Sequence, residues 1–493
     1  MAENSYKGIM KGTALFGGVQ VINVLVNIIR GKLVAVILGP DGMGISSLLT
    51  NASTTIQQFF SFGLNTTAMR EIAQARESHD HKVQSFIISV FRRLVLYAAM
   101  VAMVFTIVSS RLLSSFSFGS TEFSWFFVIL GLVVFLTLLG NGEVTLLQGM
   151  REYKRVASCS VIGSICGLIV GVPLYYIFGI YGIAPAMLVL ALVVFSYNRY
   201  NTSKLDIKPV HVTTRETFNK GRDMLVLGLL IMLGAVIGNL STYGLNAFIR
   251  FVGSIEDVGL YSAANSITNQ YVGLVFAAMA TDYFPRLAGV INNSKTDINN
   301  IVSQEAEIVL LIITPLAMLI MMSAPLIIRL LLSDEFLVVT DIIRYMGYMV
   351  IFKAVCFPLG YVGILKNNRK FYFWTECIWT NTKTFTVFSL FYYYWGINGM
   401  GIAALFSSII DLIVTLPLYN YVFKVHFTFG CLKLMAILLF MAGICLVSSL
   451  IPSAFISFIS MAIVFAITMI YVYKQINIRV DLVSIVKSKI RKE

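Results

Sequence analysis

Long apolar runs separated by short polar segments make up almost the whole chain. A helix needs about 20 mainly apolar residues to cross the roughly 30 Å hydrocarbon core of a bilayer. By this criterion the pattern predicts fourteen membrane-spanning helices. They are Met10–Leu38, Ile45–Ala68, Val83–Ser109, Phe123–Leu147, Ala157–Phe178, Ile180–Ser196, Met224–Phe251, Val258–Tyr283, Ile308–Leu332, Ile342–Leu365, Phe371–Trp395, Ile397–Val422, Leu432–Leu450 and Ser453–Tyr473.

Composition supports this fold class. The chain is 58% hydrophobic and 12% charged, whereas soluble domains are about 45–50% apolar and about 25% charged. Its mean hydropathy is +0.83. A water-soluble globule is therefore excluded, and an all-α integral membrane protein is expected. The first apolar run continues to Leu38 without a cleavage site, so we interpret it as a spanning helix and not as a removable signal peptide.

The net charge of +13 is distributed unevenly. Nearly all lysines and arginines outside the predicted spans lie on the side of the N-terminus, and Arg111 is the exception. By the positive-inside rule both termini of this multi-pass protein are expected to be cytoplasmic. Lys11, Arg92, Arg93 and Lys433 lie at cytoplasmic ends of predicted spans and are counted with that side. The other cations within spans are Arg30, Lys32, Arg250, Arg329, Arg344, Lys353 and Lys383. The acids within spans are Glu143, Asp282, Glu376 and Asp411.

Two segments of the first half recur in the second half at nearly the same spacing. Leu38–Gln58 resembles Phe251–Tyr271, which places Gly44 on Gly259. FGIYGIAPA matches WGINGMGIA, which places Gly182 on Gly399. Each repeat holds six spans, an even number, so both copies enter the membrane in the same direction. We therefore expect a pseudo-two-fold axis along the membrane normal, with the substrate site between the two halves. We expect six-helix bundles at 1–222 and 223–422, followed at 423–493 by two further helices and a basic cytoplasmic tail.

Polar side chains follow one face of the first two helices of each repeat. Helices one and seven each carry amides and end in an arginine, and helices two and eight carry more amides. Polar groups cannot face lipid tails unpaired, so these faces form interhelical hydrogen bonds or line a hydrated cavity. Hydrogen bonding is the simpler explanation for a single amide, whereas the repeat-related positions favour a cavity. The predicted substrate-binding residues on these faces are Asn23, Asn27, Arg30, Asn51, Gln58, Asn239, Asn246, Arg250, Asn265 and Asn269.

Two lysines lie near the middle of their spans. Lys353 and Lys383 are expected either to contact the substrate or to pair with Glu376 or Asp411, since a lone cation in the bilayer is costly. Arg250 lies near a helix end and could instead extend towards the membrane surface. Glu143, Glu376 and Asp411 are candidates for ion coupling. The histidines and cysteines lack metal-ligand spacing, so neither a metal nor a cofactor is expected.

Several segments together resemble a known family. They are LGPDGMGISSL, TTAMREIA, LLQGMREYKRVA, the FGIYG and WGING hairpins, and SAPLIIRLLLSDEF. They are similar to Wzx-type polysaccharide exporters, which are O-antigen flippases of the multidrug/oligosaccharidyl-lipid/polysaccharide superfamily. The resemblance covers about Lys7 to Val422.

This resemblance implies a fourteen-helix, two-bundle, multi-pass transporter of the bacterial inner membrane. It would move an undecaprenyl-pyrophosphate-linked oligosaccharide from the cytoplasmic to the periplasmic leaflet by alternating access. The resemblance implies no catalytic residue, and it makes Arg30 and Arg250 the best matches to substrate-contacting cations. The partners it suggests are the lipid-linked glycan, membrane lipids, a polysaccharide polymerase and a chain-length regulator, with no nucleic acid.

Three other functions remain open at this stage. A lipid II flippase would have similar cationic chemistry. A cation-coupled multidrug exporter of the same superfamily typically uses carboxylates in its central helices, whereas helices one and seven carry arginine and no acid. A membrane glycosyltransferase or polymerase usually has a long outer loop, but the longest one expected here is about Ser110–Glu122. An enzyme is therefore not expected.

Overall fold

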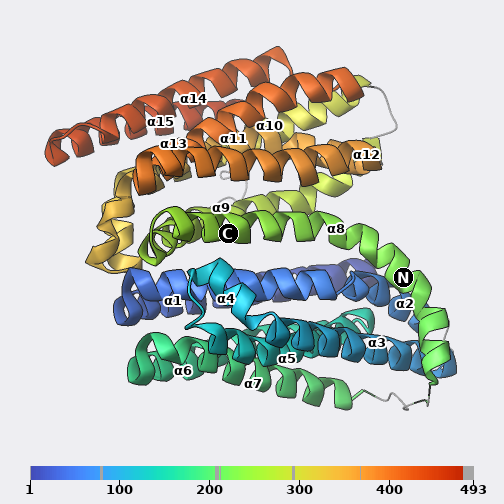
Figure 1. The fold of residues 1–493 in the computed structure, drawn as a ribbon. Helices are drawn as coiled ribbons and strands as arrows, with labels where there is room; N and C mark the ends of the chain where they lie inside the picture. Colours follow the sequence, from blue (N-terminus) through green and yellow to red (C-terminus); the bar gives the residue numbers. More distant parts are fainter. Residues whose placement is uncertain are drawn as a thin grey trace, which may run out of the picture. The chain divides into compact units, whose positions relative to one another are not determined.

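The computed structural model describes residues 2–77, 81–205, 210, 212–290, 295–366 and 368–480, apart from some side chains within these ranges. The described chain is helical and contains no strand (Figure 1). Ten of its helical segments are long and apolar enough to cross a membrane. The predicted all-α membrane fold is thereby confirmed. The basic tail after residue 480 lies outside the described residues.

The chain divides into two compact units. Unit 1 comprises Met1–Gly259 and Leu331–Ser333, and unit 2 comprises Leu260–Leu330 and Asp334–Glu493. The helix that follows the predicted boundary at residue 222 is therefore grouped with unit 1. The elements of unit 1 are α1 (Ala2–Phe60), α2 (Leu64–Glu77), α3 (His81–Val108), α4 (Ser110–Phe118), α5 (Ser124–Gly149), α6 (Tyr153–Phe178), η1 (Gly179–Gly182), α7 (Ile183–Ser203) and α8 (Thr214–Val252).

Unit 1 is built around α5 and α1. The helix α5 packs against α3 and α7, and α1 packs against α6 and α8 (Figure 1). Buried aliphatic and aromatic side chains from α2, α3 and α5 form one core cluster, which includes Ile72, Phe91 and Leu146. The segment TTAMREIA, expected to be helical and amphipathic, forms part of α2 and packs through Ile72 on α5.

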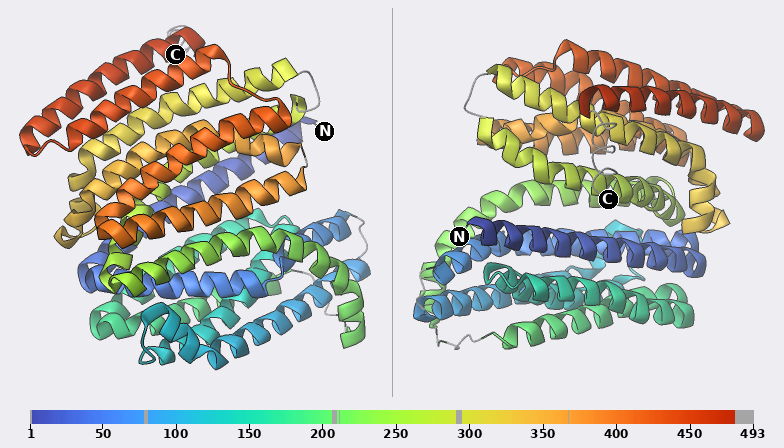
Figure 2. Two further views of the ribbon diagram at one scale, coloured as in Figure 1. Left: turned by 45° about the horizontal axis from the view of Figure 1, so that its top comes forward. Right: turned by 180° about the vertical axis from the view of Figure 1, so that it is seen from behind.

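Unit 2 contains the second set of helices. Its elements are α9 (Ile255–Val290), α10 (Lys295–Leu331), η2 (Asp334–Val339), α11 (Thr340–Leu365), α12 (Arg369–Tyr372), η3 (Phe373–Trp379), α13 (Thr380–Phe423), α14 (Phe429–Ser449) and α15 (Ala454–Val480). The helix α11 packs against α13 and α14, and α14 packs against α15. Figure 2 shows α14 and α15 running side by side as a hairpin.

Three glycines interrupt the helices at predicted boundaries between spans. Gly39, Gly179 and Gly396 have φ values of +63°, +55° and +58°. This left-handed region favours glycine because a Cβ atom would clash with the backbone. At Gly39 and Gly396 the chain bends sharply within α1 and α13. The positions match the breaks expected from the hydropathy pattern.

The glycines that the repeat places on one another have matching surroundings. Gly182 packs against the carbonyl of Leu174, and Gly399 packs against the carbonyl of Phe391. Leu174 and Phe391 have the same spacing in the sequence as the two glycines. In each case a side chain larger than hydrogen would overlap the preceding turn. The sequence repeat therefore corresponds to a repeat in local structure.

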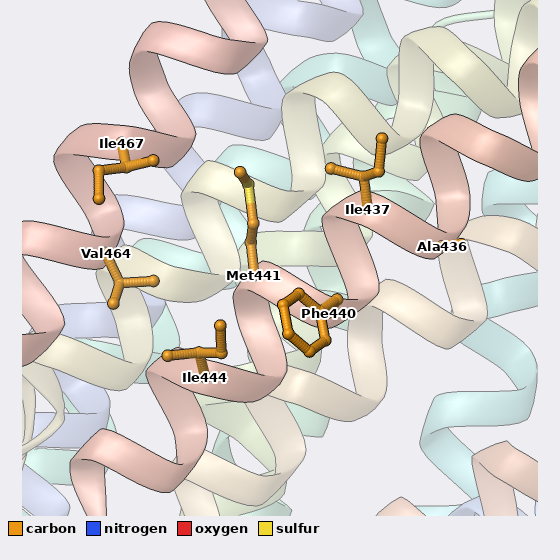
Figure 3. Close-up of a pocket in the computed structure, with 7 residues that line it drawn as sticks. All are labelled: Ala436, Ile437, Phe440, Met441, Ile444, Val464 and Ile467. Carbon is orange, nitrogen blue, oxygen red and sulfur yellow. The ribbon is translucent and has the colours of Figure 1, made fainter.

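An apolar groove runs between α14 and α15. It has a volume of about 370 Å³ and is lined by apolar side chains alone (Figure 3). Its lining residues are Ala436, Ile437, Phe440, Met441, Ile444, Val464 and Ile467. Phe440 is 71% exposed, which is the orientation expected for a side chain that contacts lipid.

Candidate substrate-binding residues in the membrane

The first polar face, on α1, is directed at α6. The Asn23 Nδ2 atom donates to the hydroxyl of Ser160 at 2.8 Å, and the Ser164 hydroxyl donates to Asn23 Oδ1 at 2.8 Å. Both ends of the amide are thus hydrogen-bonded to one helix. Asn23 therefore forms the interhelical contact that was one of the two expectations. Ser160 and Ser164 were not anticipated, because they lie on a helix far from Asn23 in the sequence.

Arg30 lies further along the same helix. Arg30 is half-buried, and its guanidinium lies against α6. A methyl group added to Gly167 of α6 would lie 3.4 Å from Arg30 Nη1. Asn27, between Asn23 and Arg30 in sequence, is exposed. The α1 face therefore combines a fixed amide, an accessible amide and a half-buried cation.

A second polar contact joins α1 to α8 within unit 1. Asn246 is 2% exposed, and its Nδ2 atom lies 3.5 Å from Ser47 Oγ. Asn51 Nδ2 reaches the same hydroxyl at 3.4 Å. Thr55 donates to the carbonyl of Asn51 at 2.7 Å and lies 3.4 Å from the carbonyl of Asn239. The structure thus brings the amides predicted on helices two and seven together.

One acceptor in this contact is unsatisfied. Asn246 Oδ1 is buried and has no hydrogen-bond partner among the described residues. A buried acceptor without a partner costs about 1–3 kcal/mol. Such a group is usually matched by water or by a ligand.

Arg250 lies against the loop that follows α4. Its guanidinium packs on Gly119, which has φ +62° and leaves no room for a side chain. Gly119 is the C-cap of α4, so the cation lies at the negative end of that helix dipole. Two residues earlier, the Ser117 hydroxyl forms a 2.5 Å hydrogen bond with Tyr243 on α8. Arg250 thus connects α8 to the end of α4. The polar face of its helix did not predict this contact.

In unit 2, Lys383 is buried and paired. Its Nζ atom lies 2.5 Å from Asp411 Oδ1 and donates to the carbonyl of Ser407 at 3.2 Å. The side chains of Lys383 and Asp411 are 4% and 30% exposed. Both residues belong to α13, on either side of its bend at Gly396. The pairing with Asp411 that the sequence offered as an alternative is the one observed.

Two more charged residues surround this pair. Glu376 and Lys353 both interact electrostatically with Asp411 and Lys383. Glu376 lies in η3, a π-helical segment whose Cys377 carbonyl accepts a hydrogen bond from Asn381 Nδ2 at 2.8 Å. π-Helical turns are rare and occur frequently at functional sites. Two acids and two bases therefore lie near one another in unit 2.

Glu143 has a different environment, at one end of unit 1. Its Oε2 atom lies 2.9 Å from Arg92 Nη2, and its Oε1 atom lies 2.7 Å from Arg199 Nη1. Its side chain is 8% exposed. The two arginines belong to α3 and α7, on either side of α5. The carboxylate therefore links α3 and α7 through α5.

Three further residues were predicted to bind substrate: Gln58, Asn265 and Asn269. Gln58 is half-buried near the end of α1, and its carbonyl accepts a hydrogen bond from Ser61. Asn265 is half-buried on α9. The side chain of Asn269 lies outside the described residues, although its backbone is helical within α9.

The chain is similar in sequence to a known protein family and to two characterised relatives. Residues 33–341 match the polysaccharide biosynthesis protein family. The chain belongs to this family. It is 21% identical over 365 residues to the lipid III flippases of Escherichia coli (strain K12) and Shigella flexneri, which covers 72% of the chain and 85% of each relative. The sequence resemblance to polysaccharide exporters is thereby confirmed.

Solved structures show which fold this member of the polysaccharide biosynthesis protein family adopts. The lipid II flippase MurJ in an inward closed conformation matches with a TM-score of 0.71 and 13% identity, covering 96% of the chain and all of that protein. An inward-facing multidrug resistance MATE transporter of the MOP superfamily matches with a TM-score of 0.66 and 18% identity, covering 82% and 96%. The chain therefore shares its helical fold with these two proteins.

Proposed function

We propose that the protein flips an undecaprenyl-pyrophosphate-linked oligosaccharide, a repeat unit of O-antigen or another surface polysaccharide, from the cytoplasmic to the periplasmic leaflet. The observation that carries the proposal is the similarity to lipid III flippases across 85% of their length. Membership of the polysaccharide biosynthesis protein family favours a glycan over a drug as cargo. No reaction is assigned to the protein, since the mechanism moves its cargo and leaves the cargo's bonds intact.

The architecture we propose has fourteen crossings in two six-helix repeats with an added pair. Bends at Gly39 and Gly396 and the break at Gly179 support division of the longest helical stretches into two crossings each. The matching packing of Gly182 and Gly399 supports a pseudo-two-fold relation. With the basic residues inside, both termini are cytoplasmic.

The chemistry of such a cargo requires a wet, cationic path. A sugar hydroxyl that loses its water without gaining a partner costs several kcal/mol, so the glycan cannot cross the hydrocarbon core directly. Accessible amides such as Asn27 can hydrogen-bond sugar hydroxyls. The guanidinium of Arg30 can bind a phosphate with two parallel hydrogen bonds. We therefore assign Arg30 and Asn27 to the substrate path, and Asn23 to the support of α1.

The membrane potential can help to drive this movement. With the inside negative, each negative charge that moves outward gains about 2.3 kcal/mol per 100 mV. Among the carboxylates predicted to couple an ion, Glu143 and Asp411 are held by arginine or lysine. Glu376 has no ion-pair partner within 4 Å among the described residues and lies on a π-helical turn. If an ion is counter-transported, Glu376 is therefore the carboxylate we assign to carry it.

Transport by the purified protein tests this function. The protein is reconstituted in liposomes with a polyprenyl-pyrophosphate-linked oligosaccharide, and the glycan exposed on the far leaflet is measured with an impermeant oxidant or lectin. We expect flipping that exceeds protein-free liposomes and accelerates with a potential negative on the starting side. Equal transport of a lipid-linked disaccharide-peptide, with none of the oligosaccharide, would instead indicate a lipid II flippase.

A further inference from the structure

The Arg92–Glu143–Arg199 cluster carries an excess of one positive charge. Each oxygen of the carboxylate binds a different arginine, and the carboxylate itself is 8% exposed. The side chains of Arg92 and Arg199 remain 31% and 50% exposed. An arginine has five N–H donors, and a single contact to Glu143 leaves most of them unused. The cluster therefore presents two oriented guanidinium groups at the surface of unit 1.

Hydrogen bonds of neighbouring residues hold the helices of the Arg92–Glu143–Arg199 cluster in place. Arg93, next to Arg92, donates to the carbonyl of Val212 in the segment that follows α7. Asn198, next to Arg199, donates to the Gly140 carbonyl on α5 at 3.2 Å. The Arg92 Nε atom is buried and has no hydrogen-bond partner among the described residues. The helices that hold the two guanidinium groups are thus fixed, while Arg92 is incompletely satisfied.

Apolar surface continues from each arginine along its helix. On α3, Leu96 and Met100 follow Arg92 at four-residue intervals and are 38% and 37% exposed. On α7, Leu192 lies two turns before Arg199 and is 52% exposed. Residues at these intervals share one helix face. The helix α5 packs against both α3 and α7 (Figure 1), so the exposed apolar side chains that follow the two cations flank α5 on its two neighbouring helices.

We propose that this surface binds an anionic glycerophospholipid. Its phosphate lies between Arg92 and Arg199, and its acyl chains lie along α3, α5 and α7. Charge complementarity argues for this occupant, because basic sites between membrane helices bind anionic head groups and guanidinium is suited to phosphate. Glu143 holds the two arginines in place and sets the net charge that the lipid neutralises. With the proposed orientation the lipid belongs to the inner leaflet.

Native mass spectrometry of the purified protein in detergent tests this site. Dioleoylphosphatidylglycerol and dioleoylphosphatidylcholine are titrated separately onto the wild type and onto Arg199→Gln. We expect the affinity for the first phosphatidylglycerol to fall at least about tenfold in the variant, the effect of losing one charge-assisted contact. Phosphatidylcholine should bind both proteins equally weakly. Equal phosphatidylglycerol binding by both proteins would overturn the proposal.

Two further variants separate binding from structural damage. In Arg199→Gln, Arg92 still pairs with Glu143, so the fold should persist, as an unchanged thermal midpoint would show. Arg155→Gln removes one charge at the same end of unit 1, where Arg155 bonds the Asn201 carbonyl at 2.8 Å, and it should bind phosphatidylglycerol like the wild type. Glu143→Gln keeps a side-chain oxygen that can accept a hydrogen bond from an arginine and raises the net positive charge of the cluster, so it should bind phosphatidylglycerol at least as tightly. A loss in Glu143→Gln as large as that in Arg199→Gln would mean a purely structural cluster and would overturn the proposal.

Inorganic pyrophosphate distinguishes a lipid site from a site for free phosphate. If the acyl chains contribute, millimolar pyrophosphate should leave most phosphatidylglycerol bound. Displacement at concentrations equal to that of the lipid would contradict a lipid site. These measurements record binding alone, so their outcome is separate from that of the transport assay.

Discussion

The backbone of Gly44 lies directly against Gly259, the residue that the sequence repeat places on it. A methyl group on Gly259 would lie 2.8 Å from the Gly44 nitrogen and would overlap the Pro40 carbonyl. A methyl group on Gly44 would overlap the Ile255 carbonyl. Pro40 and Ile255 have the same spacing in the sequence as the two glycines. The contact is therefore reciprocal, as in an interface around a two-fold axis.

This close approach predicts a strong effect of a single methyl group. Gly259→Ala should lower the free energy of unfolding by about 1–3 kcal/mol, the usual cost of inserting a methylene into a packed site. Unfolding in mixed micelles, followed by circular dichroism, measures the change. Gly31→Ala is a matched control on α1, since nothing lies within 4 Å of a methyl group there, and alanine should be neutral or slightly stabilising. Equal behaviour of the two variants would contradict the reciprocal contact.

Much of this arrangement could be predicted from the sequence. The equivalence of Gly44 with Gly259, and of Gly182 with Gly399, followed from a shared spacing alone, because a glycine needed for close packing has no substitute. Hydropathy also located the helices, since spanning length is fixed by the bilayer. Two helices, α1 and α13, nevertheless continue past a predicted break as bent helices, because a single glycine with positive φ turns the chain without a loop.

The hydrogen bonds of Asn23 predict a measurable coupling between α1 and α6. In a double-mutant cycle of Asn23→Ala and Ser164→Ala, we expect a coupling free energy of about 0.6–2 kcal/mol, the range for hydrogen bonds between membrane helices. Asn27→Ala, on the same helix but exposed, should show no coupling to Ser164→Ala. Additive effects of Asn23 and Ser164 would show that the 2.8 Å contact contributes nothing to stability.

Removal of one partner of the Lys383–Asp411 pair should destabilise unit 2. Lys383→Met leaves Asp411 without its 2.5 Å contact. We expect the free energy of unfolding to fall by about 2–3 kcal/mol. This is less than the cost of breaking a fully buried pair, because Asp411 is partly exposed. The double variant with Asp411→Leu should recover part of this loss. The exposed pair of Arg329 and Asp334 is the control, and Arg329→Ala should change stability by less than about 1 kcal/mol. A double variant less stable than Lys383→Met would contradict the pairing.

The partners of the charged residues were harder to predict. Glu143 pairs with Arg92 and Arg199, which lie 51 and 56 residues away in the sequence. The charge distribution along the chain indicated only that both arginines belong to the cytoplasmic side. Likewise, the sequence left Arg250 either in a cavity or extended towards the membrane surface, whereas its contact with Gly119 depends on how α4 folds back. Periodicity identifies the face of a helix but not the helix it meets.

The packing of Arg250 on Gly119 predicts energetic coupling between these two residues. Gly119 lies in the left-handed region at φ +62° and ψ +11°, so Gly119→Ala should lose about 1–2 kcal/mol of stability through backbone strain. A methyl group there also displaces the Arg250 guanidinium, so the loss should be larger in the wild type than in an Arg250→Ala background. Thermal unfolding in detergent measures both losses. If Gly119→Ala costs the same in the two backgrounds, Arg250 contributes no stability through this contact.

The assignment of Arg30 to the substrate path predicts a defect in transport without a defect in folding. Arg30 is half-buried beside Gly167 and has no ion-pair partner within 4 Å among the described residues. Its loss should therefore alter phosphate binding more than stability. Arg30→Ala should reduce the initial flipping rate in liposomes at least about tenfold, which corresponds to one charge-assisted contact of about 1.5–3 kcal/mol. Arg30→Lys keeps the charge but loses the planar guanidinium with its paired donors, so an intermediate rate is expected.

Arg329→Ala removes an exposed cation and should flip the substrate like the wild type. Wild-type flipping by Arg30→Ala at equal reconstitution would remove Arg30 from the path and leave Asn27 and the α1–α8 amides as its remaining candidates.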